Sequence, residues 1–381
     1  MTTCETLSFI HSNFNLLSTD VNDNITFEIT NNRYHLLRYT QGSFGKIFKL
    51  SNDENDFALK IKSVEPNVCD REYEMMKICK EQNHENVIKI TDYFRKENVE
   101  YFLMPFISMN LRQVFKYLNE KNQRMKYKSA VSMMRQITNG LKHIHSLNIM
   151  HRDLKPENIL YEPLSKRAII CDFGSAKIYN QTKPNITYIC TRWYRAPELL
   201  LERNLYTTQC DIWSLGCIFV EFCIKMPLFY NAKNSSELLS KQIKLLGNIT
   251  TNDIKDMNAT CYESLEIPEM PKIIKKPWYK VLYMKYDNKR VKTSYGATFE
   301  NMLDKILVFN PCNRLTATTI LQKSFFVDSL WSDLNTSNEN RSRDESLASS
   351  GKLSSSGSLW SLPNSNIDIF DREPANSANN I

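Results

Sequence analysis

One stretch of the chain, residues 151–174, limits its fold and chemistry more than any other; it reads HRDLKPENILYEPLSKRAIICDFG. It places an acid, Asp153, a cation, Lys155, and an amide, Asn158, within one short loop, and a second acid, Asp172, after two apolar runs. The runs predict a hairpin of short strands that carries Asp172 back toward the loop. Asp153 would accept a hydroxyl proton, while Asn158 and Asp172 would offer oxygen ligands to Mg²⁺, as phosphoryl transfer requires. A plain loop with capping and turn residues is the alternative, and it leaves this order of residues unexplained.

Composition narrows the remaining possibilities. The chain has 381 residues, 42% of them hydrophobic, which suits one large two-lobed domain or two ordinary domains with a substantial core. The net charge of +7 is not concentrated in a basic run with interleaved aromatics, so we expect no nucleic-acid partner. Ten cysteines without a C-x-x-C pair favour reduced thiols. With no signal-peptide pattern and no uninterrupted apolar span, we expect no membrane partner and a cytoplasmic location, with the nucleus as an alternative.

Four regions follow one another along the chain. Residues 1–33 form a polar N-terminal arm with one candidate strand at Ile25–Thr30, and residues 34–107 carry short β-type runs around one helix. The pattern turns helical over residues 108–326, and residues 327–381 are rich in Ser and Asn, which predicts disorder. Within the second region, the helix is predicted at Asp70–Lys80 and the strands at Tyr34–Tyr39, Lys46–Leu50, Phe57–Lys62, Val87–Phe94 and Tyr101–Phe106.

A glycine-containing turn lies between the first two strands of the second region. Its sequence is QGSFGKI, and Gly42 and Gly45 would let the backbone approach phosphates closely. Thr40 stands where a G-x-G-x-x-G pattern would have its first glycine, so we expect a stiffer loop and weaker nucleotide binding. An ordinary hairpin turn would use similar residues, and the loop alone does not decide between the two.

Further along, Lys60 sits on a predicted strand and Glu72 on the helix that follows. A lone lysine on a strand is usually a solvated edge charge. Placed after the glycine-containing turn and before Glu72, it is a candidate for pairing nucleotide phosphates, with Glu72 holding its ammonium group. Met104 and Ile107 would flank a hinge, where Met104 either closes the back of a nucleotide pocket or is a plain core residue.

Two more acidic residues are candidates for fixing the segment that follows Asp172. Glu198, in the run RAPE, and Arg314, in PCNRLTA, could form a buried ion pair. Asp211 opens the apolar run DIWSLGCIF and could either cap a helix or brace the loop around Asp153.

Taken in order across residues 34–326, these motifs resemble those of the eukaryotic protein kinases. Lys155 within HRDLKPEN is similar to the serine/threonine-specific type, and Thr191 matches the residue that contacts the catalytic Asp and Lys in that type. WYRAPE resembles the group of cyclin-dependent, mitogen-activated and glycogen synthase kinases. Within this group, CDFGSAK, TYICTRWYRAPELLL, DIKDMN and PKIIKKPWYKV are most similar to glycogen synthase kinase-3, the shaggy-type kinase.

This resemblance implies an α+β, two-lobed protein kinase fold, with a small β-rich N-lobe (34–107) containing one key helix and a large, mainly α-helical C-lobe (108–326). It implies a serine/threonine protein kinase that transfers the γ-phosphate of ATP to proteins, with ATP and Mg²⁺ as cofactors. Lys60, Asp153 and Lys155 would be catalytic, and Asn158 and Asp172 would bind the metal. The implied ATP-binding residues are Thr40, Gln41, Gly42, Ser43, Phe44, Gly45, Lys46, Ile47, Ala58, Lys60, Glu72, Met104 and Ile107.

The resemblance also implies a particular kind of protein substrate. In a kinase fold, Arg71, Arg152 and Lys177 would converge beside the activation segment, where clustered cations repel each other and need an anion. In the shaggy-type family, this anion is a phosphate already present on the substrate, four residues C-terminal to the target. We therefore expect a preference for such primed substrates; three separately solvated surface cations are the alternative.

Two regulatory features come from the same resemblance. Tyr188 occupies the position of the family's activation-segment phosphotyrosine, with Arg192 and Arg195 as partners for a phosphate. Residues 235–265 occupy the position where the family docks scaffold proteins, so a docking surface is expected there.

Two other readings remain open at this stage. A pseudokinase that serves only as a scaffold is favoured by the missing first glycine and opposed by the presence of Lys60, Glu72, Asp153, Asn158 and Asp172. A kinase of a neighbouring subfamily, such as the cyclin-dependent or dual-specificity kinases, would depend on a cyclin or be indifferent to priming.

Overall fold

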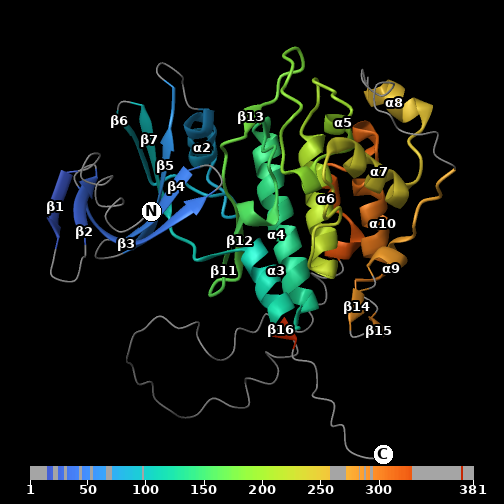
Figure 1. Ribbon diagram of the computed structural model, residues 1–381, viewed down its shortest axis with the longest axis horizontal. Coiled ribbons are helices and arrows are strands. Elements are labelled where there is room, and N and C mark those ends of the chain that lie inside the picture. The colour runs from blue at the N-terminus through green and yellow to red at the C-terminus, as the bar shows by residue number, and fades with distance from the viewer. Residues whose placement is uncertain are drawn as a thin grey trace, which may run out of the picture.

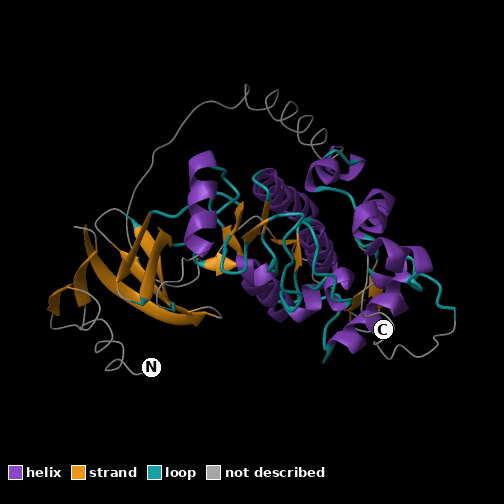
Figure 2. Ribbon diagram, turned by 90° about the horizontal axis from the view of Figure 1, so that it is seen from above, coloured by secondary structure: helices purple, strands orange, loops and turns teal. Residues whose placement is uncertain are grey.

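The computed structural model describes most of the chain between residues 15 and 327. The described residues are 15–19, 25–29, 32–42, 45–51, 55–65, 71–96, 98–257, 272–282, 284–286, 289–291, 295–327 and 370–371. A β-sheet and helix α2 (Arg71–Gln82) lie at one end of the molecule, and a larger group of helices lies at the other (Figures 1 and 2). This is the two-lobed α+β arrangement that the sequence predicted.

The small lobe is built on one seven-stranded sheet with the strand order β1-β2-β3-β4-β5-β7-β6. Every neighbouring pair is antiparallel, and each connection except the one between β5 and β6 is a hairpin-like return. The strands are β1 (Asn15–Thr19), β2 (Ile25–Ile29), β3 (Asn32–Gly42), β4 (Gly45–Ser51), β5 (Asp56–Ser63), β6 (Asp92–Lys96) and β7 (Val99–Pro105).

The N-terminal arm differs from the prediction in one respect. Its candidate strand Ile25–Thr30 appears as β2, but β1 was not predicted, and both strands extend the sheet of the small lobe. Thr26 lies opposite His35 of β3, so the described part of the arm continues the sheet by hairpin pairing. Strand β1 pairs with β2, which supplies its hydrogen-bond partners. The short sequence NLLST has no strand pattern of its own, so this pairing could not be predicted from it.

A second difference concerns the predicted strand Val87–Phe94, of which only the part from Asp92 onward is a strand, in β6. The preceding residues join the other lobe: Ile88 N donates to Ile170 O at 2.9 Å, and Ile170 N donates to Asn86 O at 2.9 Å. Val87 and Ile88 are buried there. Their apolar pattern therefore reflects contact between the lobes, with an isolated parallel β-bridge from Val87 to Ile170, and not a strand of the small-lobe sheet.

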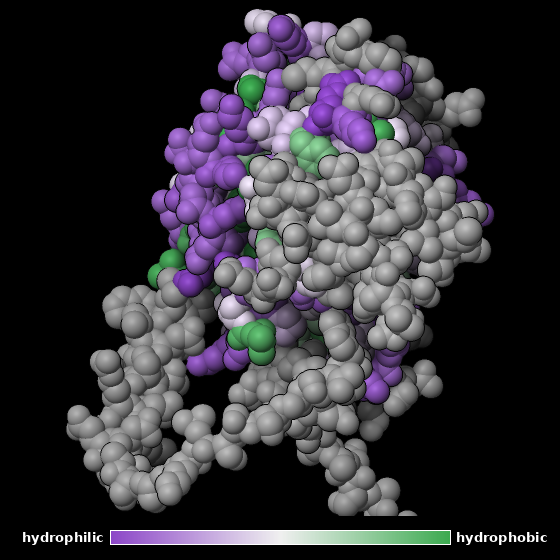
Figure 3. Space-filling model, turned by 90° about the vertical axis from the view of Figure 1, so that its left-hand side faces the viewer, coloured by the Kyte–Doolittle hydropathy of each residue, from purple (hydrophilic) through white to green (hydrophobic). Residues whose placement is uncertain are grey.

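The helix of the small lobe, α2 (Arg71–Gln82), begins and ends close to the predicted positions. Its buried residues are Glu72, Met75, Met76 and Cys79, which recur at the spacing of one helix face. Three of them pack in the core, so the same face that anchors the helix also buries the Glu72 carboxylate. Figure 3 looks onto the small-lobe end, where the coloured residues are mostly hydrophilic and hydrophobic ones are isolated.

The large lobe consists mainly of α-helices and short strands, and residues 324–327 are helical in addition to the helices given next. The helices are α3 (Leu111–Glu120), α4 (Tyr127–Ser146), α5 (Pro197–Leu200), α6 (Gln209–Ile224), α7 (Ser235–Leu246), α8 (Thr251–Met257), α9 (Trp278–Val281), α10 (Gly296–Ile306) and α11 (Ala317–Leu321). The 3₁₀ turns are η1 (Pro156–Asn158), η2 (Arg192–Tyr194) and η3 (Pro311–Asn313). The strands are β8 (Met109–Asn110), β9 (Arg124–Met125), β10 (Ile149–Met150), β11 (Ile159–Glu162), β12 (Arg167–Ile170), β13 (Lys177–Ile178), β14 (Met284–Tyr286), β15 (Lys289–Val291) and β16 (Phe370–Asp371).

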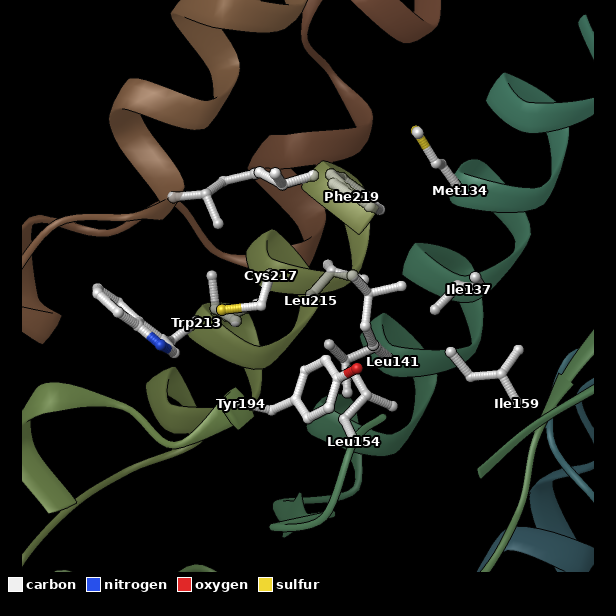
Figure 4. Packing of buried hydrophobic residues seen from close by; sticks show 14 of the residues in the cluster. Met134, Ile137, Leu141, Leu154, Ile159, Tyr194, Trp213, Leu215, Cys217 and Phe219 are labelled. Carbon is white, nitrogen blue, oxygen red and sulfur yellow. The ribbon is translucent and has the colours of Figure 1, made fainter. Parts of the chain in front are cut away.

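Helix α6 lies at the centre of this lobe. All but its first and last residues are buried, and Leu215 and Phe219 pack between α4 and the C-terminal helices (Figure 4). Ile137 and Leu141 of α4 point toward α6 in the same view. Burying an apolar helix on all sides gives the lobe a rigid axis, to which the loops of the site are attached.

The described residues bear on several remaining expectations. No helix among them has the length and apolarity needed to cross a bilayer. The cysteines that the structure describes are all free: Cys79, Cys171, Cys190, Cys210, Cys217, Cys223 and Cys312. The predicted disordered tail lies outside the described residues, apart from β16, which pairs with β9 of the large lobe.

We predict that Gly140→Ala destabilises the fold by about 1–3 kcal/mol, the usual cost of overpacking. A Cβ at position 140 of α4 would lie 2.6 Å from Asn86 O, a backbone atom held by its hydrogen bond to Ile170. Chemical denaturation would measure the loss. Lys142→Ala, at an exposed position of the same helix, is the matched control and should be neutral. Equal stabilities for the two variants would contradict this packing.

Candidate active site

Asp211, in the first turn of α6, forms hydrogen bonds with the backbone of the loop that carries Asp153. One oxygen of Asp211, Oδ2, accepts from His151 N at 2.9 Å, and Oδ1 accepts from Arg152 N at 2.8 Å. His145 Nε2 lies 2.9 Å from the same Oδ2. These contacts keep Asp211 ionised, with a pKa lowered by His145 although burial opposes it. The carboxylate thereby fixes a backbone in which Arg152 adopts a left-handed conformation, with φ of 65°.

Asp153 is buried, and both of its carboxylate oxygens have donors. Oδ1 accepts from the backbone N and from Oγ1 of Thr191, each at 2.9 Å. Oδ2 accepts from Lys155 Nζ at 2.7 Å and from Asn158 Nδ2 at 3.2 Å. Lys155 also donates to Thr191 Oγ1 at 2.9 Å. The carboxylate is therefore oriented by the loop on one side and by the activation segment on the other.

Lys60 joins the two lobes through a buried ammonium group. Its Nζ donates to Glu72 Oε1 at 2.6 Å and to Asp172 Oδ1 at 2.8 Å. Burial alone would lower the pKa of Lys60, but Glu72 and then Asp172 raise it above the ordinary lysine value. Burial likewise favours neutral Asp172, yet Lys60 lowers the pKa of Asp172 below its usual range. Both groups are thus charged at neutral pH.

The two predicted metal ligands are Asn158 of η1 and Asp172, which follows β12. Asn158 belongs to η1 and donates through Nδ2 to Asp153 O at 2.9 Å, so its Oδ1 is the atom left for a cation. Asp172 has a left-handed backbone, with φ of 67°, and its carboxylate is partly accessible. Over the described ranges, no group of three or more His, Cys, Asp or Glu side chains could hold a metal. Two hard oxygen ligands suit Mg²⁺, which usually completes its shell with phosphates and water.

The residues predicted to bind the nucleotide that the structure describes lie on the four adjacent strands β3, β4, β5 and β7, on α2, and in the segment after β7. Gly42 of β3 pairs with Gly45 of β4 at the tip of their hairpin, and Ala58 of β5 pairs with Met104 of β7. Met104 and Ile107 are half-buried and pack against the core. The strands place the other residues as follows: Thr40 and Gln41 on β3, Lys46 and Ile47 on β4, and Lys60 on β5. Ser43 and Phe44 lie outside the described residues.

The segment after Asp172 is anchored by a buried ion pair. Arg314 donates through Nη1 to Glu198 Oε1 at 2.8 Å and through Nη2 to Glu198 Oε2 at 2.6 Å. Both side chains are almost fully buried, and the Arg314 guanidinium also lies over the Trp213 ring, 5.2 Å from its centroid. A bidentate pair of this kind fixes the direction as well as the position of a segment.

Tyr188 lies in the same segment and is exposed to solvent. The Arg195 guanidinium lies over its ring, 4.4 Å from the centroid. Hydrogen bonding from Arg192, together with the charges of Arg195 and Arg192, lowers the pKa of the Tyr188 hydroxyl. The side chain therefore presents its hydroxyl in positively charged surroundings.

The structure brings Arg71, Arg152 and Lys177 into one electrostatic neighbourhood. Burial lowers the pKa of Lys177, and the charges of Arg152 and Arg71 lower it further. Arg152 is buried and donates to Ser175 O at 2.6 Å and to the Tyr206 hydroxyl at 3.0 Å. Among the described residues, none of the three cations has a carboxylate within salt-bridge distance.

Sequence reasoning missed residues that complete this cation cluster. Lys177 Nζ donates to Asn185 Oδ1 at 2.7 Å, and the Nδ2 donor of Asn185 is buried without a partner among the described residues. Tyr206 connects Arg152 to Ile186 O by a hydrogen bond of 2.8 Å. Asn185 and Tyr206 stand in segments with no periodic signal, so only the fold brings them beside the cations.

Comparisons with known proteins agree with this geometry. Residues 39–326 match the family model described as protein kinase domain. The chain is 32% identical over 322 residues to a curated protein of Pyricularia oryzae called Glycogen synthase kinase 1, an alignment that covers 81% of this chain and 76% of that protein. The family match includes the loop of Asp153, Lys60 and the Glu198–Arg314 pair. The chain therefore belongs to the protein kinase family and is a kinase of the glycogen synthase kinase type.

Proposed function

We propose that this protein kinase transfers the γ-phosphate of ATP to serine and threonine residues of proteins. The observation that carries the proposal is the position of Asp153, oriented by Lys155, Asn158 and Thr191. A hydroxyl group that approaches this carboxylate would find an acceptor for its proton and a neighbouring ammonium group. The Thr191 contact ties the acceptor to the activation segment, so the order of that segment would control the geometry of transfer.

The other side of the site suits ATP with Mg²⁺. The pairing of Gly42 with Gly45 brings two residues without side chains to the hairpin tip, where a backbone can cover phosphates. Lys60 supplies a fixed cation for phosphate oxygens, while Asn158 and the ionised Asp172 supply hard ligands for the metal. Bound Mg²⁺ would neutralise charge on the phosphates. The chain's own contribution is to hold the cation, the proton acceptor and the ligands in fixed positions.

Asp153→Asn tests the role of the carboxylate directly. We expect turnover to fall by at least about 100-fold, because an amide keeps the shape of the side chain but cannot accept the proton. Initial rates of phosphate transfer to a protein substrate would measure this. Asp253→Asn, a half-exposed position on α8, is the matched control and should retain full turnover. Full activity of Asp153→Asn would contradict the assignment. A wild-type chain that transfers no phosphate from ATP would instead favour a scaffold function.

We further propose that the kinase prefers substrates that already carry a phosphate four residues C-terminal to the target. Support comes from three features of the cation cluster of Arg71, Arg152 and Lys177. The cations lower the pKa of Lys177, they have no described carboxylate partner, and the buried Nδ2 of Asn185 points to a missing acceptor. A phosphate would supply both the negative charge and the acceptor oxygens.

The preference is measurable with paired peptides that differ only in the priming phosphate. We expect kcat/KM to be at least about tenfold higher for the primed peptide, because charge-assisted hydrogen bonds contribute roughly 1.5–3 kcal/mol each. Arg71→Ala should reduce this ratio, whereas Lys77→Ala, at another exposed position of α2, should preserve it. Equal rates for both peptides in the wild-type enzyme would remove this part of the proposal.

Tyr188 is the proposed activation-segment phosphorylation site. Its exposure makes the hydroxyl accessible, and Arg192 and Arg195 already surround it with positive charge. A phosphate there would gain charge-assisted contacts with both arginines and order the segment. We expect mass spectrometry to find phosphate on Tyr188 and Tyr188→Phe to lower activity. Full activity of Tyr188→Phe would show that the phosphate is dispensable.

We propose that scaffold proteins dock on the surface formed by residues 235–265. Within the described part of this range, α7 and α8 form the outer side of the large lobe (Figure 1). Residues 258–265 lie outside the described residues. We propose a cytoplasmic location, with the nucleus as an alternative; microscopy of the tagged chain tests it, and a membrane-bound signal would contradict it.

A further inference from the structure

Four side chains from separate segments meet beside the catalytic loop. Arg112 of α3 donates through Nε to Glu157 Oε1 at 2.8 Å, through Nη1 to Glu221 Oε1, and through Nη2 to the Tyr194 hydroxyl at 2.5 Å. Tyr194 in turn donates to Glu221 Oε2 at 2.6 Å. We refer to Glu157, Tyr194 and Glu221 as the acidic subsite, because two of its three members are carboxylates and Arg112 is the cation that fills it.

The acidic subsite is closed at its base and open at its mouth. The Glu221 side chain is 0% exposed, whereas those of Glu157 and Arg112 are 41% and 26% exposed. Tyr194 is buried against Leu141 and Leu154 and forms part of the wall (Figure 4). The Glu157 end of the subsite is therefore its solvent-exposed end, where another guanidinium group could enter if Arg112 were absent.

The charges of the subsite favour a guanidinium group over a neutral occupant. Burial raises the pKa of Glu221, and the charge of Arg112 opposes that rise. Glu157 Oε2 is buried and has no hydrogen-bond partner within the described residues. Two carboxylates face one guanidinium, so an acceptor remains unused even when Arg112 is in place. A planar fork of N–H donors is the group that best matches paired carboxylate oxygens.

The subsite lies within reach of a substrate residue near the phosphorylated one. Glu157 directly precedes Asn158, whose Nδ2 lies 3.2 Å from Asp153 Oδ2. An extended peptide advances about 3.3 Å per residue, so a side chain a few positions from the target can span the distance between neighbouring loop residues. The Glu157 end of the subsite is therefore within the reach of a peptide whose target hydroxyl lies at Asp153.

We propose that Arg112 is a built-in occupant of the acidic subsite and that, by filling it, Arg112 prevents the kinase from selecting substrates with an arginine close to the target residue. This inference rests on the proposed phosphate transfer to protein substrates and adds a residue that determines their selection. Because Arg112 already pairs with the two carboxylates, a basic side chain on the substrate gains no favourable contact with them. Arg112 therefore affects specificity by excluding one class of substrate and not by attracting another.

The test uses a set of primed peptides, all with the phosphate four positions after the target serine, in which one arginine is moved from four positions before that serine to three positions after it. Wild-type enzyme should phosphorylate all of them at similar rates. Arg112→Ala should raise kcat/KM at least about tenfold for at least one arginine position relative to the alanine peptide, since a new charge-assisted contact with Glu157 and Glu221 becomes available. A purely structural role of Arg112 would change stability without creating this preference.

Three further variants isolate the charge. Arg112→Lys keeps a cation in the subsite and should show much less of the gain. Glu157→Gln combined with Arg112→Ala removes a carboxylate and should reduce the gain. Lys116→Ala removes an exposed cation from the same helix, 3.7 Å from Glu120, and should behave like the wild type.

Arg112→Gln replaces the alanine variant in the test if that variant folds poorly. The glutamine amide can still donate hydrogen bonds to the subsite but carries no positive charge. A folded Arg112 variant, verified by thermal melting, that shows no arginine preference would overturn the inference while leaving the proposed function intact. Failure of both the Ala and the Gln variants to fold would overturn it too, since Arg112 would then be a structural brace. A wild-type enzyme that phosphorylates none of the peptides would overturn the proposed function and the inference with it.

Discussion

The active site depends on one buried ammonium group, that of Lys60, which lies between the carboxylates of Glu72 and Asp172. The three residues come from strand β5 of the small lobe, from helix α2 of that lobe, and from the segment after β12 in the large lobe. Removing one partner of such a buried pair typically costs about 3–5 kcal/mol, because a charge is left uncompensated. The contact therefore sets the position of the cation that we propose to bind phosphate. It also fixes α2 and the proposed metal ligand Asp172 relative to that cation.

Several buried charges of the large lobe have a partner of opposite charge, whereas one cluster of cations has no carboxylate partner among the described residues. Arg314 is matched by Glu198, and Asp211 is matched by two backbone N–H groups and His145. The cation cluster of Arg71, Arg152 and Lys177 has no such match among the described carboxylates, although Arg152 is buried. An unpaired cluster is costly unless an anion completes it. This contrast is the structural basis of the proposed preference for primed substrates, whose phosphate would supply the missing negative charge.

How far the sequence predicted this arrangement varies from element to element. Strands and the α2 helix followed from local periodicity, and the family resemblance brought Lys60, Asp153 and Asp172 into one site. The strand β1 was missed, and Val87–Ile88 was misread, because sheet pairing and contact between lobes depend on residues far away in sequence. Arg112 shows the same limit: its partner Glu221 lies 109 positions away, and neither residue has a motif around it. Sequence motifs therefore predict the chemistry of the site. The partners of these residues that are distant in sequence can be identified only from the folded structure.

The most direct test of the central claim is to follow radiolabelled γ-phosphate from ATP with Mg²⁺ onto a protein substrate and to identify the labelled amino acids after hydrolysis. The geometry around Asp153 and Lys155 predicts label on serine and threonine. No transfer, or label confined to tyrosine, would contradict the account.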